Sequence, residues 1–319
     1  MGRTAAALAL LAAVLAPSAD AQAPAPAQLR AVVATAREGD TLPDLARANG
    51  LGYVELVAAN PGVDPWRPRP GHPVVLPVAH LAPELPAPLV VNLGDMRLYH
   101  RRHGGSIASF PIGIGRDGWE LAAGMSTTVV RKRERPTWVP PASIRAEKPW
   151  LPASVPPGPD NPLGEYSLDL GLGLIRIHGT NRPDGVGRRV SHGCIRLYPE
   201  DIARLFPDIA VGTAVAVVDQ PAKLAWLDDG ELWLEIHPSQ DQADAVEYRR
   251  PLPRHEVARL EERVLAAAGA EAARIDWGLV AWAEETRLGV PVRVTRPAAG
   301  PPTALLAEKE RPGGHASGP

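Results

Sequence analysis

The apolar residues of the chain change their spacing along its length, and these changes divide it into three folded segments. The first segment, residues 31–78, begins and ends with short strand-like runs at 31–35 and 72–77. Between them, apolar positions recur at helical spacing and predict two short helices, one ending at Asn49-Gly50 and one over 53–59. The expected order in this segment is therefore strand, helix, helix, strand.

The second segment, residues 88–218, consists mainly of short apolar runs between turn residues. Strands are predicted at 89–93, 96–99, 107–115, 126–132, 166–170, 174–178 and 213–218, with one short helix at 199–206. A proline-rich stretch, residues 136–162, interrupts them as a long loop, and loops of that length inside a domain usually have a function. We expect a β-rich domain with a sandwich-like or barrel-like sheet.

The third segment, residues 222–295, mixes both periodicities. Two strand-like runs flank the hairpin signal Asp228-Asp229-Gly230, and helices are predicted at 255–268 and 275–286. Residues 79–88, rich in proline, are predicted to be a linker between the first two segments. The chain is thus predicted to be a multidomain α+β protein, with a small βααβ module, a central β-rich domain and a small C-terminal α/β segment.

Both ends of the chain differ in composition from the folded segments. Residues 1–21 have the features of a cleavable signal peptide: Arg3 precedes an apolar stretch, and Ala19-Asp20-Ala21 is a small-residue cleavage site. The alternative is an uncleaved membrane anchor, although the apolar stretch is short for a helix that spans a bilayer. Residues 297–319 are rich in Pro, Gly and Ala and predict a disordered tail. We expect a soluble mature protein outside the cytoplasm.

Composition narrows the choice of partners and the means of stabilisation. The formal net charge is −2, which argues against a nucleic-acid partner because such proteins usually present a basic surface. Cysteine occurs once, at Cys194, so no intrachain disulfide can form and stability must come from apolar cores. A lone thiol in an exported protein therefore needs a chemical explanation.

The residues around Cys194 supply what a thiol nucleophile needs. Cys194 lies in the run Ser191-His192-Gly193-Cys194-Ile195-Arg196-Leu197, which follows His178 in the sequence. An ordinary thiol has a pKa of about 8.5 and is a thiolate in only a few per cent of molecules at neutral pH, so a histidine must take its proton. Strand alternation places His178 on the face opposite Ile177 and, if the cysteine run is extended, Cys194 and Arg196 on one face. Gly193 permits a close backbone approach directly before the nucleophile.

These motifs resemble the active-site signature of the YkuD-type L,D-transpeptidases, in particular the ErfK-like enzymes. The residues that carry the resemblance are Ile177-His178-Gly179-Thr180 and the cysteine run, with further matches at 111–115, 136–138, 159–164 and 198–201. The first segment resembles a LysM module through Gly39-Asp40-Thr41-Leu42, Ala59-Asn60-Pro61, Pro70-Gly71 and residues 74–77.

The resemblance implies a periplasmic cysteine transpeptidase that uses no cofactor and no metal. Such an enzyme attacks the tetrapeptide stems of peptidoglycan, releases D-alanine, holds the acyl group as a thioester and passes it to an amine. The amine would belong to a second stem peptide or to an outer-membrane lipoprotein. The LysM resemblance implies binding to glycan chains that contain N-acetylglucosamine.

The resemblance also implies roles for individual residues. Cys194 would be the nucleophile, and His178 the general base, oriented through the backbone carbonyl of Gly179. The backbone N–H groups of Gly193 and Cys194, with His192 as a further candidate, would stabilise the oxyanion.

Three further residues are candidates for substrate contact. Ser191 and Arg196 would shape the site and contact substrate carboxylates. Arg196 departs from the asparagine found at this position in other branches of the family. Arg145, in the proline-rich loop, is a further candidate contact.

Other interpretations of the same residues remain open. Water in place of an amine would make the enzyme an L,D-carboxypeptidase or hydrolase, and an inactive catalytic domain would leave a wall-binding scaffold. Cys194 could be an inert buried residue. His178, His192 and Cys194 could instead bind zinc, although a fourth ligand is not evident in the motif.

Overall fold

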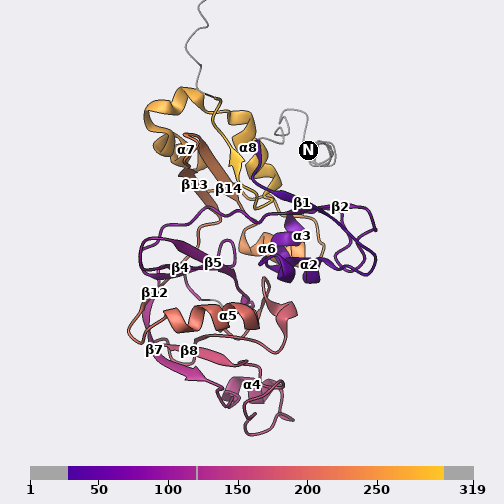
Figure 1. Cartoon of the computed structure of the whole chain (residues 1–319), viewed down its shortest axis with the longest axis vertical. Helices are drawn as coiled ribbons and strands as arrows, with labels where there is room; N and C mark the ends of the chain where they lie inside the picture. Colours follow the sequence, from indigo (N-terminus) through magenta and orange to yellow (C-terminus); the bar gives the residue numbers. More distant parts are fainter. Residues whose placement is uncertain (1–27, 120, 298–319) are drawn as a thin grey trace, which may run out of the picture.

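The computed structural model describes residues 28–119 and 121–297 of the chain. The leader predicted at 1–21 and nearly all of the tail predicted at 297–319 lie outside this range. Within it, no helix combines the length and the apolar character needed to cross a bilayer. Figure 1 shows the C-terminal helices α7 and α8 at one end of the molecule and helix α4 at the other.

The first segment folds in the predicted order. Strands β1 (Val32–Thr35) and β2 (Pro73–Leu76) pair antiparallel, and the chain between them forms helices α2 (Leu42–Ala48) and α3 (Tyr53–Ala58). The buried Asn60 side chain joins α3 to β2, because it donates to the carbonyl of Leu56 and accepts from the N–H of Val75 at 2.7 Å. The two strands and two helices are therefore tied together locally.

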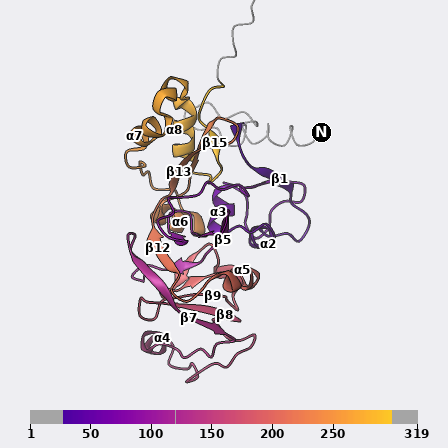
Figure 2. The same ribbon diagram turned by 60° about the vertical axis from the view of Figure 1, so that its left-hand side comes forward.

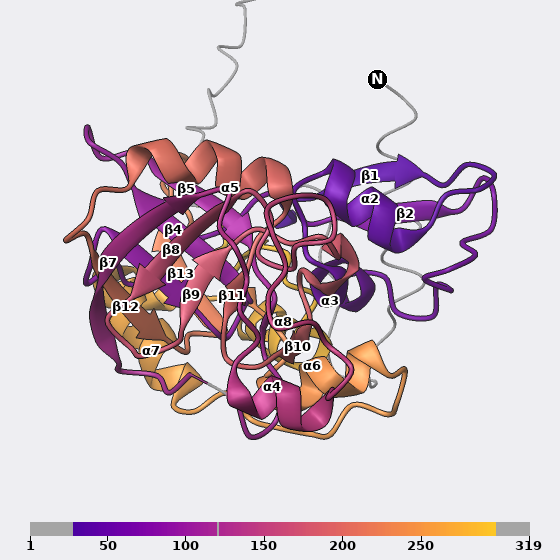
Figure 3. The same ribbon diagram turned by 90° about the horizontal axis from the view of Figure 1, so that it is seen from below.

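The second segment is built on an eight-stranded mixed sheet that curls into a half-barrel (Figure 3). Its strands, in their order across the sheet, are β11 (Ile195–Arg196), β9 (Arg176–His178), β8 (Tyr166–Leu170), β7 (Ser126–Glu134), β12 (Ala214–Val218), β3 (Leu89–Asn92), β4 (Arg97–Arg101) and β5 (Ile107–Pro111). Strand β11 runs parallel to β9 and β12 parallel to β3, whereas the other neighbours are antiparallel. A short parallel pair, β6 (Ile114–Gly115) with β10 (Arg189–Ser191), and helix α5 (Pro199–Leu205) complete this segment. The expected strand-rich domain is thus present, as one curled sheet.

The proline-rich loop at 136–162 has structure of its own. Helix α4 (Ala142–Glu147) lies within it, and Trp138 and Val155 exchange backbone hydrogen bonds across it at 2.9 and 2.8 Å. At its base, the buried side chain of Asn161 donates to the carbonyl of Pro136 at 2.6 Å. The long loop predicted here is therefore closed on itself and contains one short helix, and we call residues 136–162 the lid.

The third segment forms a three-stranded antiparallel sheet with three helices. The strands are β13 (Ala222–Trp226), β14 (Leu232–Ile236) and β15 (Val292–Arg293), and the helices are α6 (Gln240–Glu247), α7 (Leu260–Ala268) and α8 (Trp277–Thr286). Helix α7 starts at Leu260 and not at residue 255, because Arg259 has a left-handed backbone with φ 55°. Helix α8 starts at Trp277, where the side chain of Asp276 accepts from the N–H of Leu279. The sequence did not predict α6.

The first segment is packed directly onto the second. The carboxylate of Glu55 on α3 accepts from the guanidinium of Arg97 on β4 at 2.9 Å, and both side chains are buried. The N–H of Val54 donates to the carbonyl of Gly187 at 3.1 Å. A Cβ atom on Gly187 would lie 2.2 Å from the backbone nitrogen of Tyr53, so only glycine allows this approach. Figure 2 shows α3 beside the eight-stranded sheet.

The predicted linker at 79–88 is packed as well. The N–H of Leu81 donates to the buried carboxylate of Glu235 at 2.5 Å. The Nζ atom of Lys223 lies 2.7 Å from Asp95 and 2.7 Å from Glu235, in contact with both the second and the third segment. Buried charges persist when they are paired in this way, and this pair of contacts fixes the third segment against the sheet.

One group of described side chains has the proximity that a metal ion requires. It consists of Asp95, Glu235 and His237, all buried. The ammonium group of Lys223 already binds one oxygen of each carboxylate at 2.7 Å, and His237 Nε2 lies 2.5 Å from Glu235. Because these contacts satisfy the carboxylate oxygens, we assign no metal here.

Candidate active site

The parallel pairing of β9 with β11 brings the two motif segments together. Ile195 lies beside Ile177, and Arg196 lies beside His178. The isoleucines are fully buried in the core, so alternation turns His178 and Arg196 to the opposite face. The backbone N–H of Leu197 donates to the carbonyl of His178 at 2.9 Å, which fixes this register. Residues far apart in the sequence therefore meet at one sheet edge.

The turn that carries Cys194 is held by glycine and serine. Gly193 has φ 89°, and a Cβ atom there would lie 2.9 Å from the Ile175 side chain and 3.3 Å from the Trp119 carbonyl. The hydroxyl of Ser191, which is completely buried, donates to the carbonyl of Cys194 at 2.6 Å. Ser191 thus shapes the turn, and its contact with substrate stays a prediction.

The Cys194 thiol is partly accessible and has a perturbed pKa. Its Sγ atom donates to the carbonyl of Leu174 at 3.6 Å. Burial raises the pKa of the thiol, while the backbone N–H of Arg176 and the charges of Arg176 and Arg196 oppose that rise. The resting group is consequently a thiol that needs a base, as the sequence predicts for a cysteine nucleophile.

His178 has the properties of that base. It is buried, and its Nδ1 atom lies 2.5 Å from the carbonyl oxygen of Gly179. A carbonyl only accepts, so Nδ1 carries the proton and Nε2 keeps its free electron pair. Burial, followed by the charge of Arg196, lowers the pKa of His178 to about 3 against the hydrogen bond to Gly179, which raises it. The imidazole is therefore neutral and able to accept a proton at neutral pH.

Backbone donors lie free beside the nucleophile. Within the described part of the chain, no hydrogen bond uses the N–H of Gly193 or the N–H of Cys194. Such groups on a fixed turn are suited to bind a developing oxyanion, and each is worth roughly 3 kcal/mol in comparable sites. Their assignment to the oxyanion hole stays a prediction from the resemblance.

Cys194 and His178 line the same cavity, of about 360 Å³. The lid covers it with Trp138 and Ile144, and Arg196 forms part of its wall. A second cavity of about 480 Å³ shares Trp138, Ile144 and Arg196 with the first, and we call it the chamber. Cys194 therefore lines only the smaller cavity, and the chamber adjoins that cavity at Arg196.

His192 connects the cysteine turn to the lid. Its Nε2 atom lies 3.0 Å from Glu147 at the end of α4 and 3.0 Å from Arg116, which itself pairs with Glu147 at 2.7 Å. The ring packs edge-on against Trp119 at 5.0 Å. Sequence reasoning missed Glu147, Arg116 and Trp119, because the spacing of these residues in the chain carries no sign of their partnership with His192.

The two predicted arginines differ in position. Arg196 lines both cavities, and its Nε atom is buried without a hydrogen-bond partner. Arg145 lies on the exposed side of α4 and is not among the residues that line either cavity. The structure therefore joins Cys194, His178 and Arg196 but not Arg145, whose contact with substrate stays a prediction.

Comparison with known proteins agrees with this site. The family model described as the L,D-transpeptidase catalytic domain, YkuD, matches residues 87–232. The chain is 36% identical to the probable L,D-transpeptidase YcfS of Escherichia coli. The alignment of 276 residues covers 83% of this chain and 84% of that protein. It is 42% identical to the probable L,D-transpeptidase ErfK/SrfK of the same organism. That alignment of 221 residues covers 66% of this chain and 71% of that protein.

A solved structure of an L,D-transpeptidase from Mycobacterium smegmatis superposes with a TM-score of 0.30 at 21% identity, over 41% of this chain and 58% of that one. The matched family region includes the strands and the turn that carry His178 and Cys194, whereas the βααβ segment lies outside it. The similarity to YcfS extends over most of both chains. The chain therefore belongs to the YkuD family of L,D-transpeptidases, which are cysteine-dependent transpeptidases.

Proposed function

We propose that this chain is an exported, periplasmic transpeptidase that cuts tetrapeptide stems of peptidoglycan and transfers the resulting acyl group to an amine. The observation that carries the proposal is the single thiol of Cys194 in one cavity with a neutral His178 whose Nε2 is free to accept a proton. The amine of the acceptor completes the reaction, and no metal or cofactor takes part in it.

In the first step, Cys194 Sγ attacks the carbonyl carbon between the third and fourth stem residues. The thiol proton passes to His178 Nε2 after the side chain turns from the Leu174 carbonyl toward the imidazole, and the new S–C bond creates an oxyanion. The N–H groups of Gly193 and Cys194 stabilise that charge. When the C–N bond breaks, the imidazolium returns its proton to the leaving nitrogen, and D-alanine departs.

In the second step, the amine of an acceptor attacks the thioester carbonyl. A C–N bond forms, the amine proton passes to His178, and the C–S bond breaks as the imidazolium gives that proton to the sulfur, which restores the Cys194 thiol. The lid favours this outcome over hydrolysis, because Trp138 and Ile144 cover the cavity and limit the access of water. The acceptor is a second stem or a lysine of an outer-membrane lipoprotein.

The test is to incubate the full chain with a tetrapeptide stem, alone and with an excess of either acceptor peptide, and to identify all products by mass spectrometry. We expect D-alanine, a covalent adduct on Cys194 and an amide-linked product with one of the acceptors. A tripeptide and D-alanine, with no amide-linked product, would identify the enzyme as a hydrolase. Absence of both D-alanine and adduct would leave the scaffold interpretation.

We infer that the βααβ segment binds peptidoglycan glycan close to the catalytic domain. Its resemblance to a LysM module supports glycan binding, and the buried pair of Glu55 and Arg97 supports a fixed position relative to the sheet. We expect the full chain to sediment with purified glycan strands from which an amidase has removed the stems. Protein that stays in the supernatant under these conditions would contradict the inference.

A further inference from the structure

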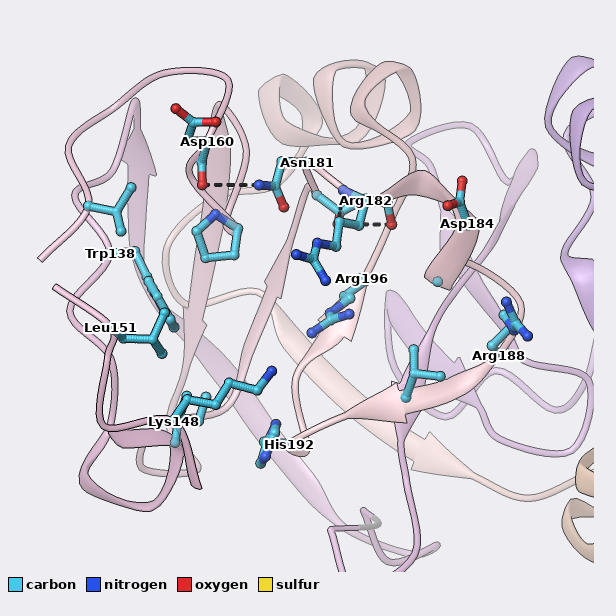
Figure 4. A pocket seen from close by; sticks show the side chains of 16 residues that line it. Trp138, Lys148, Leu151, Asp160, Asn181, Arg182, Asp184, Arg188, His192 and Arg196 are labelled. Atoms are coloured by element: carbon cyan, nitrogen blue, oxygen red, sulfur yellow. Dashed lines mark hydrogen bonds between the residues drawn. The ribbon is translucent and has the colours of Figure 1, made fainter. Parts of the chain in front are cut away.

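The chamber on the far side of Arg196 has the charge and shape of a binding site for an anion. Figure 4 shows Arg182 and Arg196 extending side by side toward its centre, with Lys148 and His192 directed toward the same space. The chamber encloses about 480 Å³ and meets the Cys194 cavity at Arg196 and His192. An anion held there would lie beside the cavity that contains Cys194.

Two of these cations lack a protein counter-ion. Within the described residues, neither Arg182 nor Arg196 makes a side-chain hydrogen bond or an ion pair, and Nε of Arg196 is buried without a partner. After burial and the opposing effect of Cys194, the like charge of Arg182 contributes to lowering the pKa of Arg196, as expected for two guanidinium groups that face one space. Unpaired arginines in a cavity are the usual partners of carboxylates.

The local structure holds Arg182 in this position. The hydroxyl of Thr180, which follows the base in the sequence, accepts from the N–H of Arg182 at 2.9 Å and donates to its carbonyl at 3.2 Å. Thr180 is buried, so this small loop is anchored in the sheet. Beside it, the guanidinium of Arg196 packs against Gly185, with Nη1 at 3.5 Å from the place where a Cβ atom would be.

The other charged groups that line the chamber do not neutralise the positive charge of Arg182 and Arg196. Arg188 is engaged by Glu247 at 2.9 Å and lies over the ring of Tyr53 at 4.5 Å. Asp160 and Asp184 also line the chamber, but they lie at its edge in Figure 4, away from the two guanidinium groups. The centre of the chamber thus keeps a local positive charge.

We propose that this chamber recognises the carboxylate on the carbon next to the attacking amine of the acyl acceptor, and that Arg182 and Arg196 bind it together. The inference rests on the proposed function. D-alanine, the leaving group, carries its carboxylate one carbon from the nitrogen that departs. Attack by an amine is the reverse of that departure, so the entering nitrogen passes through the same place, with its own carboxylate held by the same arginines.

The chemical step is balanced without any further reagent. The uncharged amine attacks the thioester carbonyl, a C–N bond forms and the C–S bond breaks. The amine proton passes to His178 and from there to the departing sulfur, so the thiol and the neutral imidazole are both restored. The carboxylate takes no part in bond making and only orients the amine. An acceptor whose amine has a neighbouring carboxylate is therefore preferred over one with the same amine and a neutral neighbour. Of the two acceptors proposed above, this disfavours a lysine side chain, because the carbon next to its amine carries no carboxylate.

Glycine and glycinamide are the matched probes, because they differ only in that carboxylate. The acyl-enzyme is formed from a tetrapeptide stem, both probes are supplied, and the two products are quantified by mass spectrometry. We expect Arg182→Gln to lower the ratio of glycine to glycinamide product about tenfold relative to the wild type, and Arg182→Lys to retain most of it. Differences in amine reactivity cancel because each ratio is compared with that of the wild type.

Arg101→Gln is the control, since Arg101 is an exposed arginine on β4, at the opposite side of the sheet from β9 and β11, and its ratio should equal that of the wild type. An unchanged ratio in Arg182→Gln, with normal D-alanine release, would overturn the inference and leave the proposed function intact. If the wild type releases no D-alanine, the proposed function fails. A binding measurement then tests separately whether the chamber recognises a carboxylate. In that case we expect N-acetylglycine, followed by NMR, to bind Cys194→Ser protein about tenfold more tightly than the Cys194→Ser, Arg182→Gln protein, and equal binding would overturn the site.

Discussion

Replacing Cys194 with serine should reduce D-alanine release from a tetrapeptide stem by at least about 10⁴-fold. An alcohol is far less acidic than a thiol, and a neutral imidazole whose own pKa lies near 3 is too weak a base to activate it. The fold should persist, because a hydroxyl can replace the weak hydrogen bond from Sγ to the Leu174 carbonyl. We expect the free energy of unfolding to change by less than about 1 kcal/mol.

The chain has one cysteine, so this experiment contains its own labelling control. Iodoacetamide should add one label to the wild type and none to Cys194→Ser, with labelling that accelerates as pH rises because burial raises the thiol pKa. Turnover by a folded Cys194→Ser protein at a rate near that of the wild type would refute the assignment of the nucleophile.

Replacing His178 with glutamine should lower the rate of D-alanine release about 10²- to 10³-fold at neutral pH. The wild-type base stays unprotonated well below pH 6, because the pKa of His178 is about 3. Between pH 5 and 7 the wild-type rate should therefore show no loss from protonation of this residue. In the variant the reaction must wait for free thiolate, so its rate should rise about tenfold per pH unit. Equal pH profiles for both proteins would contradict the role of His178.

Replacing His178 with glutamine should also change how the free energy of unfolding depends on pH. The folded protein keeps His178 neutral down to about pH 3, whereas an unfolded histidine binds a proton below about 6.5. The unfolded state therefore binds more protons in this window, and the wild type loses stability as pH falls from 6.5 toward 3. From pH 7 to pH 5 this residue alone accounts for about 2 kcal/mol in the free energy of unfolding.

His178→Gln should remove this contribution to the change in the free energy of unfolding between pH 7 and pH 5, as measured by urea unfolding at both pH values. His103→Gln is the matched control, because His103 is exposed at a hairpin, and it should change neither the slope nor the reaction rate. If the His178→Gln variant loses as much stability between pH 7 and pH 5 as the wild type, the conclusion that folded His178 is buried and neutral is wrong. A base that weakens the protein in acid and is nevertheless essential for the rate is characteristic of a residue retained for chemistry.

The sequence alone predicts much of the local structure. Alternation and helical spacing place β1, α2, α3 and β2 within a residue or two of their observed positions, because each element is defined by neighbours in the chain. Residue types and their order around Cys194 and His178 likewise predict a nucleophile and a base. The same reasoning places the start of α7 too early, because apolar spacing contains no sign of the left-handed conformation at Arg259.

What the sequence by itself determined is therefore most of the elements, without α4 and α6, and it predicts the reacting groups, since both are encoded over short stretches. The tertiary structure alone decided that His192 joins Glu147 on the lid, that Gly187 receives α3 and that Arg182 shares a chamber with Arg196. These contacts depend on the pairing of β9 with β11 and on the path of the lid between distant segments. Local periodicity reports which face of an element is buried, whereas the choice of its partner is made by packing across the whole molecule.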